Sequence, residues 1–230
     1  INIGWGGSWG HRDDLLSILP SIRNLLQEVP TLTFSLMGAA PFKAILESEL
    51  PEGRWNYTPP NSLEKYYHFL STLHIGIAPL LDTEFNRCRS DIKFLEYAAH
   101  GVVPIVRDLA PYQMTLENGK TGFLYRSPTE LKHLIKRLIE KPNLRREVQT
   151  NCRNYIAKHR IEALNAAERS KEYWQLLSPL PQTNPSTSNA FISLPYQQRE
   201  KALIMGLSQS PQNIPSAALQ LIKQGAGHHY

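Results

Sequence analysis

The stretch NRCRSDIKFLEYAAHGVVPIV (residues 86–106) joins a charged, helix-like segment directly to a short apolar run. Its first part carries Phe94, Leu95 and Tyr97 among charged residues, as a half-buried helix does. Its last part, VVPIV (102–106), has the length and apolar density of a buried strand. The same alternation of strand and helix recurs along the first 125 residues. Such alternation indicates βαβ units, and therefore a parallel sheet with helices on both faces.

The expected strands are the short apolar runs at residues 1–5, 32–38, 54–58, 74–80, 102–106 and 122–125. Helices are expected between them, including one from about 13 to 29, one from 62 to 73 that Ser62 caps, and one that Ser90 caps and that starts at Asp91. After Ser127 the pattern predicts three helices, at roughly 128–140, 142–158 and 160–177. We therefore predict an α/β domain with a doubly wound parallel sheet over residues 1–177.

The residues after 177 have a different composition. SPLPQTNPSTSN (178–189) combines three prolines with Ser, Thr and Asn, which predicts a linker over residues 178–194. Residues 195–230 predict a short helical segment, with two helices joined by Pro and Asn. Its spacing fits the start of a tetratricopeptide-like repeat region, or equally a helical extension of the main domain.

Bulk composition narrows the class of protein. The hydrophobic content of 41% is ordinary for a globular protein, and no apolar stretch approaches the roughly 20 residues that span a bilayer. Cys88 and Cys152 lie far apart in sequence, which argues against a disulfide framework and favours a reducing, cytoplasmic setting. Because the chain begins at Ile1 and not at Met, directly with strand-like residues, we interpret it as a fragment of a longer protein.

Positive charge is concentrated in the C-terminal helices. The formal net charge is +5, and residues 132–160 hold many Lys and Arg residues against only Glu140 and Glu147. One interpretation is a solvated helical face, and the other is a surface that associates with anionic lipid at the membrane or with an acidic partner. Nucleic acid is disfavoured, because no stacking aromatic residues or recognisable nucleic-acid motif accompany the charge.

A glycine-rich loop follows the first expected strand. Gly4, Gly6, Gly7 and Gly10 stand between that strand and a helix, where a backbone can approach a diphosphate closely. The spacing differs from G-x-G-x-x-G, so a tight turn without a ligand is equally consistent. His11 has the same two interpretations, as a donor to phosphate or as a solvated loop residue.

Lys93 and Glu96 are three residues apart and share one face of the expected helix. A cation in the first turn repels the helix dipole, and a bound anion would remove that conflict. Glu96, one turn deeper, could then accept hydrogen bonds from vicinal hydroxyls. The pair therefore predicts phosphate at one end of a ligand and sugar hydroxyls at the other. The alternative is a simple Lys–Glu ion pair within the helix.

The segments RSDIKFLEYAAHGVVPIVRDLAPY (89–112) and ENGKTGFLY (117–125) resemble the donor-binding, C-terminal half of a GT-B glycosyltransferase of the family-four, or group-one, type. Further segments follow in the order of that family, namely GWGGSWGHRDDL (4–15), LMG (36–38) and YYHFLSTLHIGIAPL (66–80). The resemblance covers residues 1–177. It implies a Rossmann-like fold that holds a nucleotide sugar at the carboxyl ends of its strands.

The resemblance also implies roles for individual residues. Glu96 would hold the ribose hydroxyls, and Arg89 and Lys93 would act in catalysis by stabilising the leaving diphosphate. Thr58 and Pro59 would form the nucleobase loop. The implied transfer is retaining, with no metal or other cofactor, and the implied partners are a nucleotide-sugar donor and an N-terminal acceptor domain of the same chain. The implied donor-binding residues are Gly7, Ser8, His11, Asn86, Ser90, Asp91, Lys93 and Glu96.

Two departures from the family pattern concern charge. Cys88 stands where the family has a second glutamate, so that carboxylate is absent or is replaced by Glu84 or Asn86. The first loop has Ser8 and about Asp13 where the family often has Arg and Lys, which leaves Arg12, Arg89 or Lys93 to supply the positive charge. A divergent donor site is one interpretation. The alternative is a non-catalytic interaction module with a degenerate site, and a nucleotide-sugar epimerase of the same architecture is disfavoured by the order of the motifs.

Overall fold

The computed structural model describes residues 1–177, so the predicted linker at 178–194 and the helical segment at 195–230 lie outside the described residues. Residues Ile1–Leu164 form one compact unit. The final described helix, α10 (Glu162–Leu177), begins two residues before the last residue of that unit. The predicted domain boundary at residue 177 stays a prediction.

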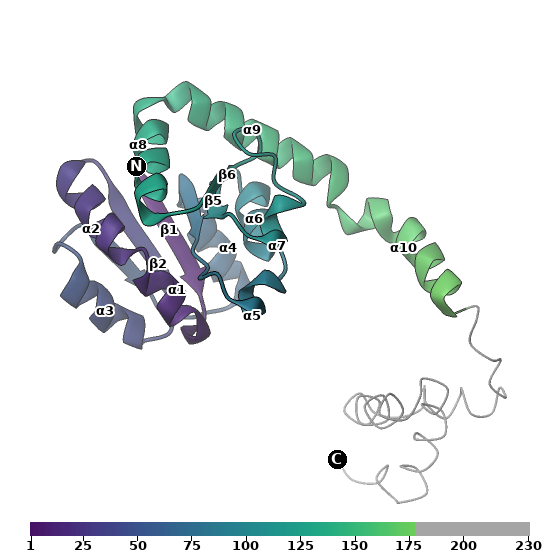
Figure 1. The fold of residues 1–230 in the computed structure, drawn as a ribbon, viewed down its shortest axis with the longest axis horizontal. Helices are drawn as coiled ribbons and strands as arrows, with labels where there is room; N and C mark the ends of the chain where they lie inside the picture. The colour runs from purple at the N-terminus through teal and green to yellow at the C-terminus, as the bar shows by residue number, and fades with distance from the viewer. Residues whose placement is uncertain (178–230) are drawn as a thin grey trace, which may run out of the picture. The chain divides into compact units, whose positions relative to one another are not determined.

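The compact unit is built on a sheet of six parallel strands in the order β3-β2-β1-β4-β5-β6 (Figure 1). The chain moves outward from β1 through β2 to β3, then returns to the other side of β1 for β4 and continues to β6. This reversal between β1 and β4 is the switch point of a doubly wound sheet, and it confirms the predicted α/β, Rossmann-like fold class. The strands are β1 (Asn2–Gly7), β2 (Thr33–Gly38), β3 (Trp55–Thr58), β4 (Ile75–Ala78), β5 (Val103–Arg107) and β6 (Phe123–Tyr125).

Helices cover both faces of the sheet, and the side chains of β2, β4, β5 and β6 alternate between two apolar clusters. One face packs against α1 (Arg12–Leu16), α2 (Leu19–Glu28), α3 (Pro41–Glu49) and α8 (Pro128–Glu140). The other packs against α4 (Leu63–Ser71), α6 (Ile92–Ala99), α7 (Ala110–Gln113) and α9 (Pro142–His159). The last of these helices reaches both layers, since its Val148 belongs to the first cluster and its Cys152 to the second.

The centre of the sheet includes a glycine whose space is filled by a tyrosine ring. A Cβ added at Gly76 in β4 would lie only 2.4 Å from atoms of the Tyr97 ring. Tyr97 comes from α6, is fully buried, and donates a hydrogen bond from its hydroxyl to the carbonyl of Ile77 at 2.8 Å. The glycine thus lets α6 approach β4 closely, and α6 is the helix that carries Lys93 and Glu96.

Two expected helix boundaries are wrong. The helix expected at 13–29 is two helices, because Pro20 has no N–H to bond to the preceding turn and instead occupies the first turn of α2. The helix expected to start at Asp91 with Ser90 as its cap begins at Ile92, with Asp91 in the N-cap position. The Asp91 carboxylate bonds Arg160 instead of capping the helix. The Ser62 cap is confirmed, since its hydroxyl accepts from the Lys65 N–H at 3.4 Å.

Short helices at the carboxyl ends of the strands were not expected. The 3-10 helix η1 (Trp9–His11) follows β1, and α5 (Glu84–Arg87) follows β4. The three C-terminal helices lie within two residues of their expected bounds. Within residues 1–177, no helix combines the length and the apolar character that crossing a membrane requires.

Candidate functional site

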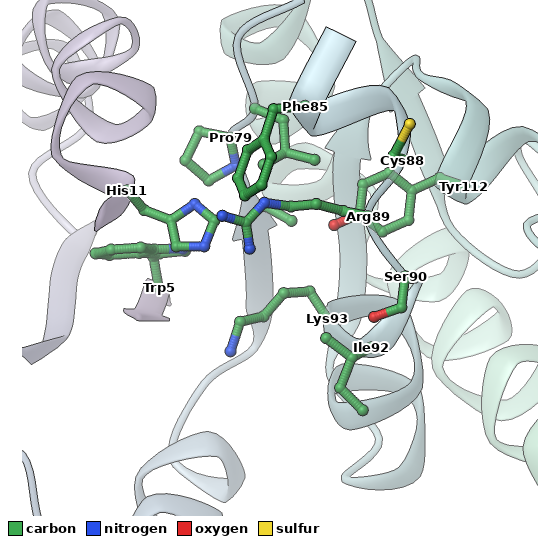
Figure 2. Close-up of a pocket in the computed structure, with 12 residues that line it drawn as sticks. Trp5, His11, Pro79, Phe85, Cys88, Arg89, Ser90, Ile92, Lys93 and Tyr112 are labelled. Carbon is green, nitrogen blue, oxygen red and sulfur yellow. The ribbon is translucent and has the colours of Figure 1, made fainter. Parts of the chain in front are cut away.

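Two cavities lie side by side at the carboxyl edge of the sheet, one on each side of β1, and Lys93 lines both. The β4 cavity, of about 350 Å³, is lined by Trp5, His11, Ala78, Pro79, Leu80, Phe85, Cys88, Arg89, Ser90, Ile92, Lys93 and Tyr112 (Figure 2). The β2 cavity, of about 400 Å³, is lined by Gly6, Gly7, Ser8, Trp9, Met37, Gly38, Ala39, Pro60, Asn61, Tyr66 and Lys93.

The topology of the sheet explains why the site lies there. The loops after β1 and β4 leave in opposite directions at the switch point, so a crevice opens between them. The first turn of α6 borders the β4 cavity, and the N–H groups at the start of a helix have no partner within the helix. Anions bind favourably at such a helix start, where the dipole is positive.

Lys93, Tyr66 and Glu96 form a hydrogen-bonded cluster. Lys93 Nζ donates to the Tyr66 hydroxyl at 2.6 Å and to Glu96 Oε2 at 2.8 Å, and the Tyr66 hydroxyl donates to the same carboxylate oxygen at 2.7 Å. The Lys93 and Glu96 side chains are 21% and 18% exposed. Burial, and then the Glu96 carboxylate, raise the pKa of Tyr66 well above its ordinary value, so its hydroxyl stays protonated.

This cluster confirms that Lys93 and Glu96 share one face, and it shows the ion pair that the sequence offered as an alternative. It also shows that Tyr66 bonds both side chains, which the sequence did not indicate. Tyr66 and Lys93 line the β2 cavity, whereas Glu96 is not among its lining residues. Both hydrogen bonds to the Glu96 carboxylate reach the same oxygen, Oε2.

Asp14 is the centre of a second cluster, beneath the β4 cavity. Its side chain accepts three hydrogen bonds, from His11 Nδ1 at 2.8 Å, from the Leu81 N–H at 2.6 Å and from Asn86 Nδ2 at 3.0 Å. Burial by itself raises the pKa of Asp14, but the hydrogen bonds from His11 and Leu81 outweigh it, and the pKa is lowered from its ordinary value. Asp14 is therefore an ionised carboxylate at neutral pH, although only 5% of the residue is exposed.

A lowered carboxylate pKa predicts a pH dependence of stability. A depressed folded-state pKa adds stability above the unfolded-state value of about 4, and the stability is lost as the pH falls below that value. The free energy of unfolding should therefore decrease more steeply below about pH 4 in the wild type than in Asp14→Asn. Urea denaturation between neutral and acidic pH measures this difference. Asp13→Asn, at an exposed neighbouring position, is the control, and parallel curves for wild type and Asp14→Asn would contradict the prediction.

The predicted site residues divide into two groups. Gly7, Ser8, His11, Arg89, Ser90 and Lys93 line the two cavities. Three predicted residues line neither cavity, namely Asn86, Asp91 and Glu96. Asn86 is buried against Asp14, and Asp91 bonds Arg160 at 2.6 and 3.2 Å. Glu96 bonds Lys93 and Tyr66. The expected nucleobase-loop residues Thr58 and Pro59 precede the lining residues Pro60 and Asn61, since Thr58 still belongs to β3.

The structure also shows where the residues lie that were considered as replacements for the family's second glutamate and for its first-loop cations. Cys88 is exposed and lines the β4 cavity, while Glu84 is exposed and lines neither cavity. The Arg12 guanidinium pairs with Asp13, outside both cavities. Among the described residues that line the β4 cavity there is no carboxylate, and its charged side chains are Arg89 and Lys93 together with the ionisable His11.

Sequence reasoning missed several residues of the site. Trp5 and Tyr112 line the β4 cavity, and Trp9, which is 42% exposed, lines the β2 cavity. A tryptophan within a glycine-rich loop was the available signal for Trp9, and the three-residue spacing from His11 was the signal for Asp14. No metal site is indicated, because within residues 1–177 no three His, Cys, Asp or Glu side chains gather closely enough to hold an ion.

Comparison with known proteins shows which family and fold this chain resembles. A sequence model of the family described as "Glycosyl transferase-like" matches residues 17–166. No curated protein matches the sequence. The C-terminal domain of the glycosyl transferase group 1 family protein LpcC from Francisella tularensis matches the fold with a TM-score of 0.59 and 15% identity, over 69% of this chain and 85% of that domain.

Two longer structures match the same part of the chain. HepE from Anabaena, solved with UDP-glucose, has a TM-score of 0.62 and 14% identity, over 76% of this chain. Sucrose-phosphate synthase from Thermosynechococcus elongatus has a TM-score of 0.61 and 14% identity, over 77% of this chain. The chain spans only 49% of HepE and 45% of the synthase. At this level of identity the likeness shows the shared fold, which is the predicted C-terminal half of GT-B.

Proposed function

Because this chain belongs to the glycosyl transferase-like family, we propose that it is the donor-binding half of a glycosyltransferase, and that it binds a nucleoside-diphosphate sugar across its two cavities. The observation that carries the proposal is the position of Lys93, which lines both cavities at the β1–β4 switch point. A ligand with a diphosphate in its middle fits this arrangement, with its nucleoside in one cavity and its sugar in the other.

The diphosphate would lie beside Lys93 at the start of α6. Arg89 and Lys93 supply positive charge there, His11 supplies a ring nitrogen, and the main chain of Gly7 and Ser8 approaches from the opposite side. When the bond to the sugar breaks, negative charge develops on the leaving diphosphate. Cationic side chains and helix N–H groups fixed in place stabilise that charge without a metal ion.

The nucleoside would occupy the β2 cavity. Trp9, Met37 and Pro60 give this cavity apolar surfaces suited to a flat base, and Asn61 adds an amide. The Glu96 carboxylate lies behind Tyr66 and Lys93 and would accept hydrogen bonds from the ribose hydroxyls. The structure of HepE with UDP-glucose supports a nucleotide sugar as the ligand class.

The sugar would occupy the β4 cavity, near Cys88 and Ser90. We further propose transfer with retention of configuration to an acceptor held by an N-terminal domain of the same chain. The part of HepE that this chain does not span supports such a domain. The unpaired thiols Cys88 and Cys152 support a cytoplasmic setting.

The basic C-terminal helices offer less free charge than the sequence indicated. Lys132 and Lys136 both pair with Glu28, and Arg160 pairs with Asp91. Arg145 donates to the Leu138 carbonyl. These contacts favour the solvated helical face over a membrane-binding surface.

Calorimetric titration of the chain with UDP, GDP, ADP and their common sugar conjugates tests the proposal. We expect saturable binding of one nucleotide and its sugar conjugate, which would also identify the base. Lys120→Ala, an exposed lysine paired with Glu117 away from both cavities, should bind as the wild type does. A folded sample that binds none of these ligands would support the alternative, a non-catalytic module in which Cys88 marks a degenerate site.

A further inference from the structure

We propose that Asp14 is a positioning residue of the diphosphate site, because its buried carboxylate connects the His11 imidazole and the Arg89 guanidinium through one hydrogen-bonded network. This inference rests on the proposed function, since it concerns the side chains that would hold the diphosphate. The network runs from His11 to Asp14, from Asp14 to Asn86 and from Asn86 to Arg89. Both of its ends line the β4 cavity, while Asp14 and Asn86 do not.

The first branch fixes the orientation of His11. An ionised carboxylate can only accept a hydrogen bond, so the Nδ1 atom of His11, 2.8 Å from Asp14 Oδ2, carries the proton between them. The other ring nitrogen, Nε2, is then the one left for a ligand, and it donates to a phosphate oxygen when the ring carries its second proton. The Trp5 ring packs against the imidazole edge-on, with 6.2 Å between the ring centroids, which further limits its rotation. Figure 2 shows His11 and Arg89 directed toward one another from opposite walls of the cavity.

The second branch fixes Arg89. Asn86 donates to Asp14 Oδ1 at 3.0 Å and to the Leu81 carbonyl at 2.9 Å, so its amide oxygen points away from both. That oxygen accepts from Arg89 Nε at 3.2 Å. The guanidinium also lies over the Phe85 ring, 4.7 Å from its centroid. With Nε held, the two terminal NH₂ groups are available for bidentate contact with phosphate oxygens.

The chemistry of the network favours a role toward the ligand over a purely structural one. Asp14 is only 5% exposed, so its ionised carboxylate has lost most of its hydration, which costs free energy. An asparagine at this position could bond the same loop without that cost. The charge of Asp14 does what an amide cannot. It accepts from three donors at once, and it holds the Nδ1–H group of His11 so that Nε2 is left for the ligand.

Asp14→Asn tests the inference, because it keeps the size of the side chain and removes its charge. We expect the affinity of the chain for the nucleoside diphosphate that it binds, and for inorganic pyrophosphate, to fall about 10-fold in calorimetric titration. In a chain that already carries His11→Ala and Arg89→Ala, the same substitution should change neither affinity, because Asp14 acts through those two side chains. Asp13→Asn is the matched control and should bind as the wild type does.

The inference is overturned if Asp14→Asn lowers the affinity equally in both backgrounds, or if it does not lower the affinity in the wild-type background. In either case, nucleotide binding by the wild type still supports the proposed function. A wild type that binds neither nucleotide nor pyrophosphate would overturn both. Asn86→Ala breaks only the Arg89 branch and carries the test if Asp14→Asn does not fold. Its expected loss of about 3-fold should disappear in an Arg89→Ala background, and persistence of that loss would count against the network.

Discussion

Replacing Lys93 with alanine is expected to weaken binding of the nucleoside diphosphate and of inorganic pyrophosphate alike, by about 10- to 100-fold. Lys93 is the side chain that lines both cavities, and hydrogen bonds from an ammonium group to phosphate are among the stronger ones in proteins. Calorimetric titration with both ligands measures the effect. An unchanged affinity for either ligand would reduce Lys93 to its ion pair with Glu96.

Glu96 provides the complementary result within the same experiment. Glu96→Ala should weaken binding of the nucleoside diphosphate but not of pyrophosphate, because only the former has ribose hydroxyls. The Lys93 ammonium would keep its hydrogen bond to the Tyr66 hydroxyl in this variant, so the phosphate end of the site is retained. Equal losses for both ligands would argue that Glu96 acts only by holding Lys93. Lys120→Ala again serves as the control for a change of surface charge.

Gly76→Ala is expected to lower the free energy of unfolding by about 1–3 kcal/mol, which is the usual range for overpacking a core. The added Cβ would lie 2.4 Å from the fully buried Tyr97 ring, and the strands on both sides of β4 prevent the backbone from moving away. The ring must then shift, which also strains its hydrogen bond to Ile77. Urea denaturation measures the loss.

Two variants make this result specific to the contact with Tyr97. Gly10→Ala adds the same methyl group where the nearest atom, the Ser8 hydroxyl oxygen, is 3.8 Å away, and it should leave stability nearly unchanged. Tyr97→Leu removes the ring, so adding Gly76→Ala to that variant should have a smaller effect than in the wild type. A loss of the same size in both backgrounds would contradict the explanation.

The order of strands and helices could be predicted from the sequence because local signals determine it. Continuous apolar runs such as VVPIV indicate buried strands. Ser62 indicates a helix start, because its hydroxyl accepts a hydrogen bond from Lys65, only three positions further along the chain. The boundary near Asp91 was wrong for the opposite reason. The partner of Asp91 is Arg160, which lies 69 residues away in sequence, and no local pattern indicates such a pair.

The candidate site divides in the same way. His11, Arg89 and Lys93 could be identified as candidates because cations near a glycine-rich loop and a helix start are visible in the sequence. Tyr66 could not, and for Asp14 only the three-residue spacing from His11 was visible, since the roles of both depend on residues of other elements. Tyr66 on α4 meets Lys93 and Glu96 on α6, and Asp14 on α1 meets Leu81 and Asn86 after β4.

The pairing of β1 with β4 has a consequence for how the site is assembled during folding. The contact between Asn2 and His74 joins residues 72 positions apart. In contrast, β1 and β2 are consecutive strands joined through η1, α1 and α2. Contacts of such long sequence separation close large loops and form slowly. A chain that has reached β3 during synthesis contains the glycine-rich loop and the end of β2, but no residue of β4 or α6. The crevice exists only after β4 and α6 have joined the sheet, so its formation reports the completion of the fold.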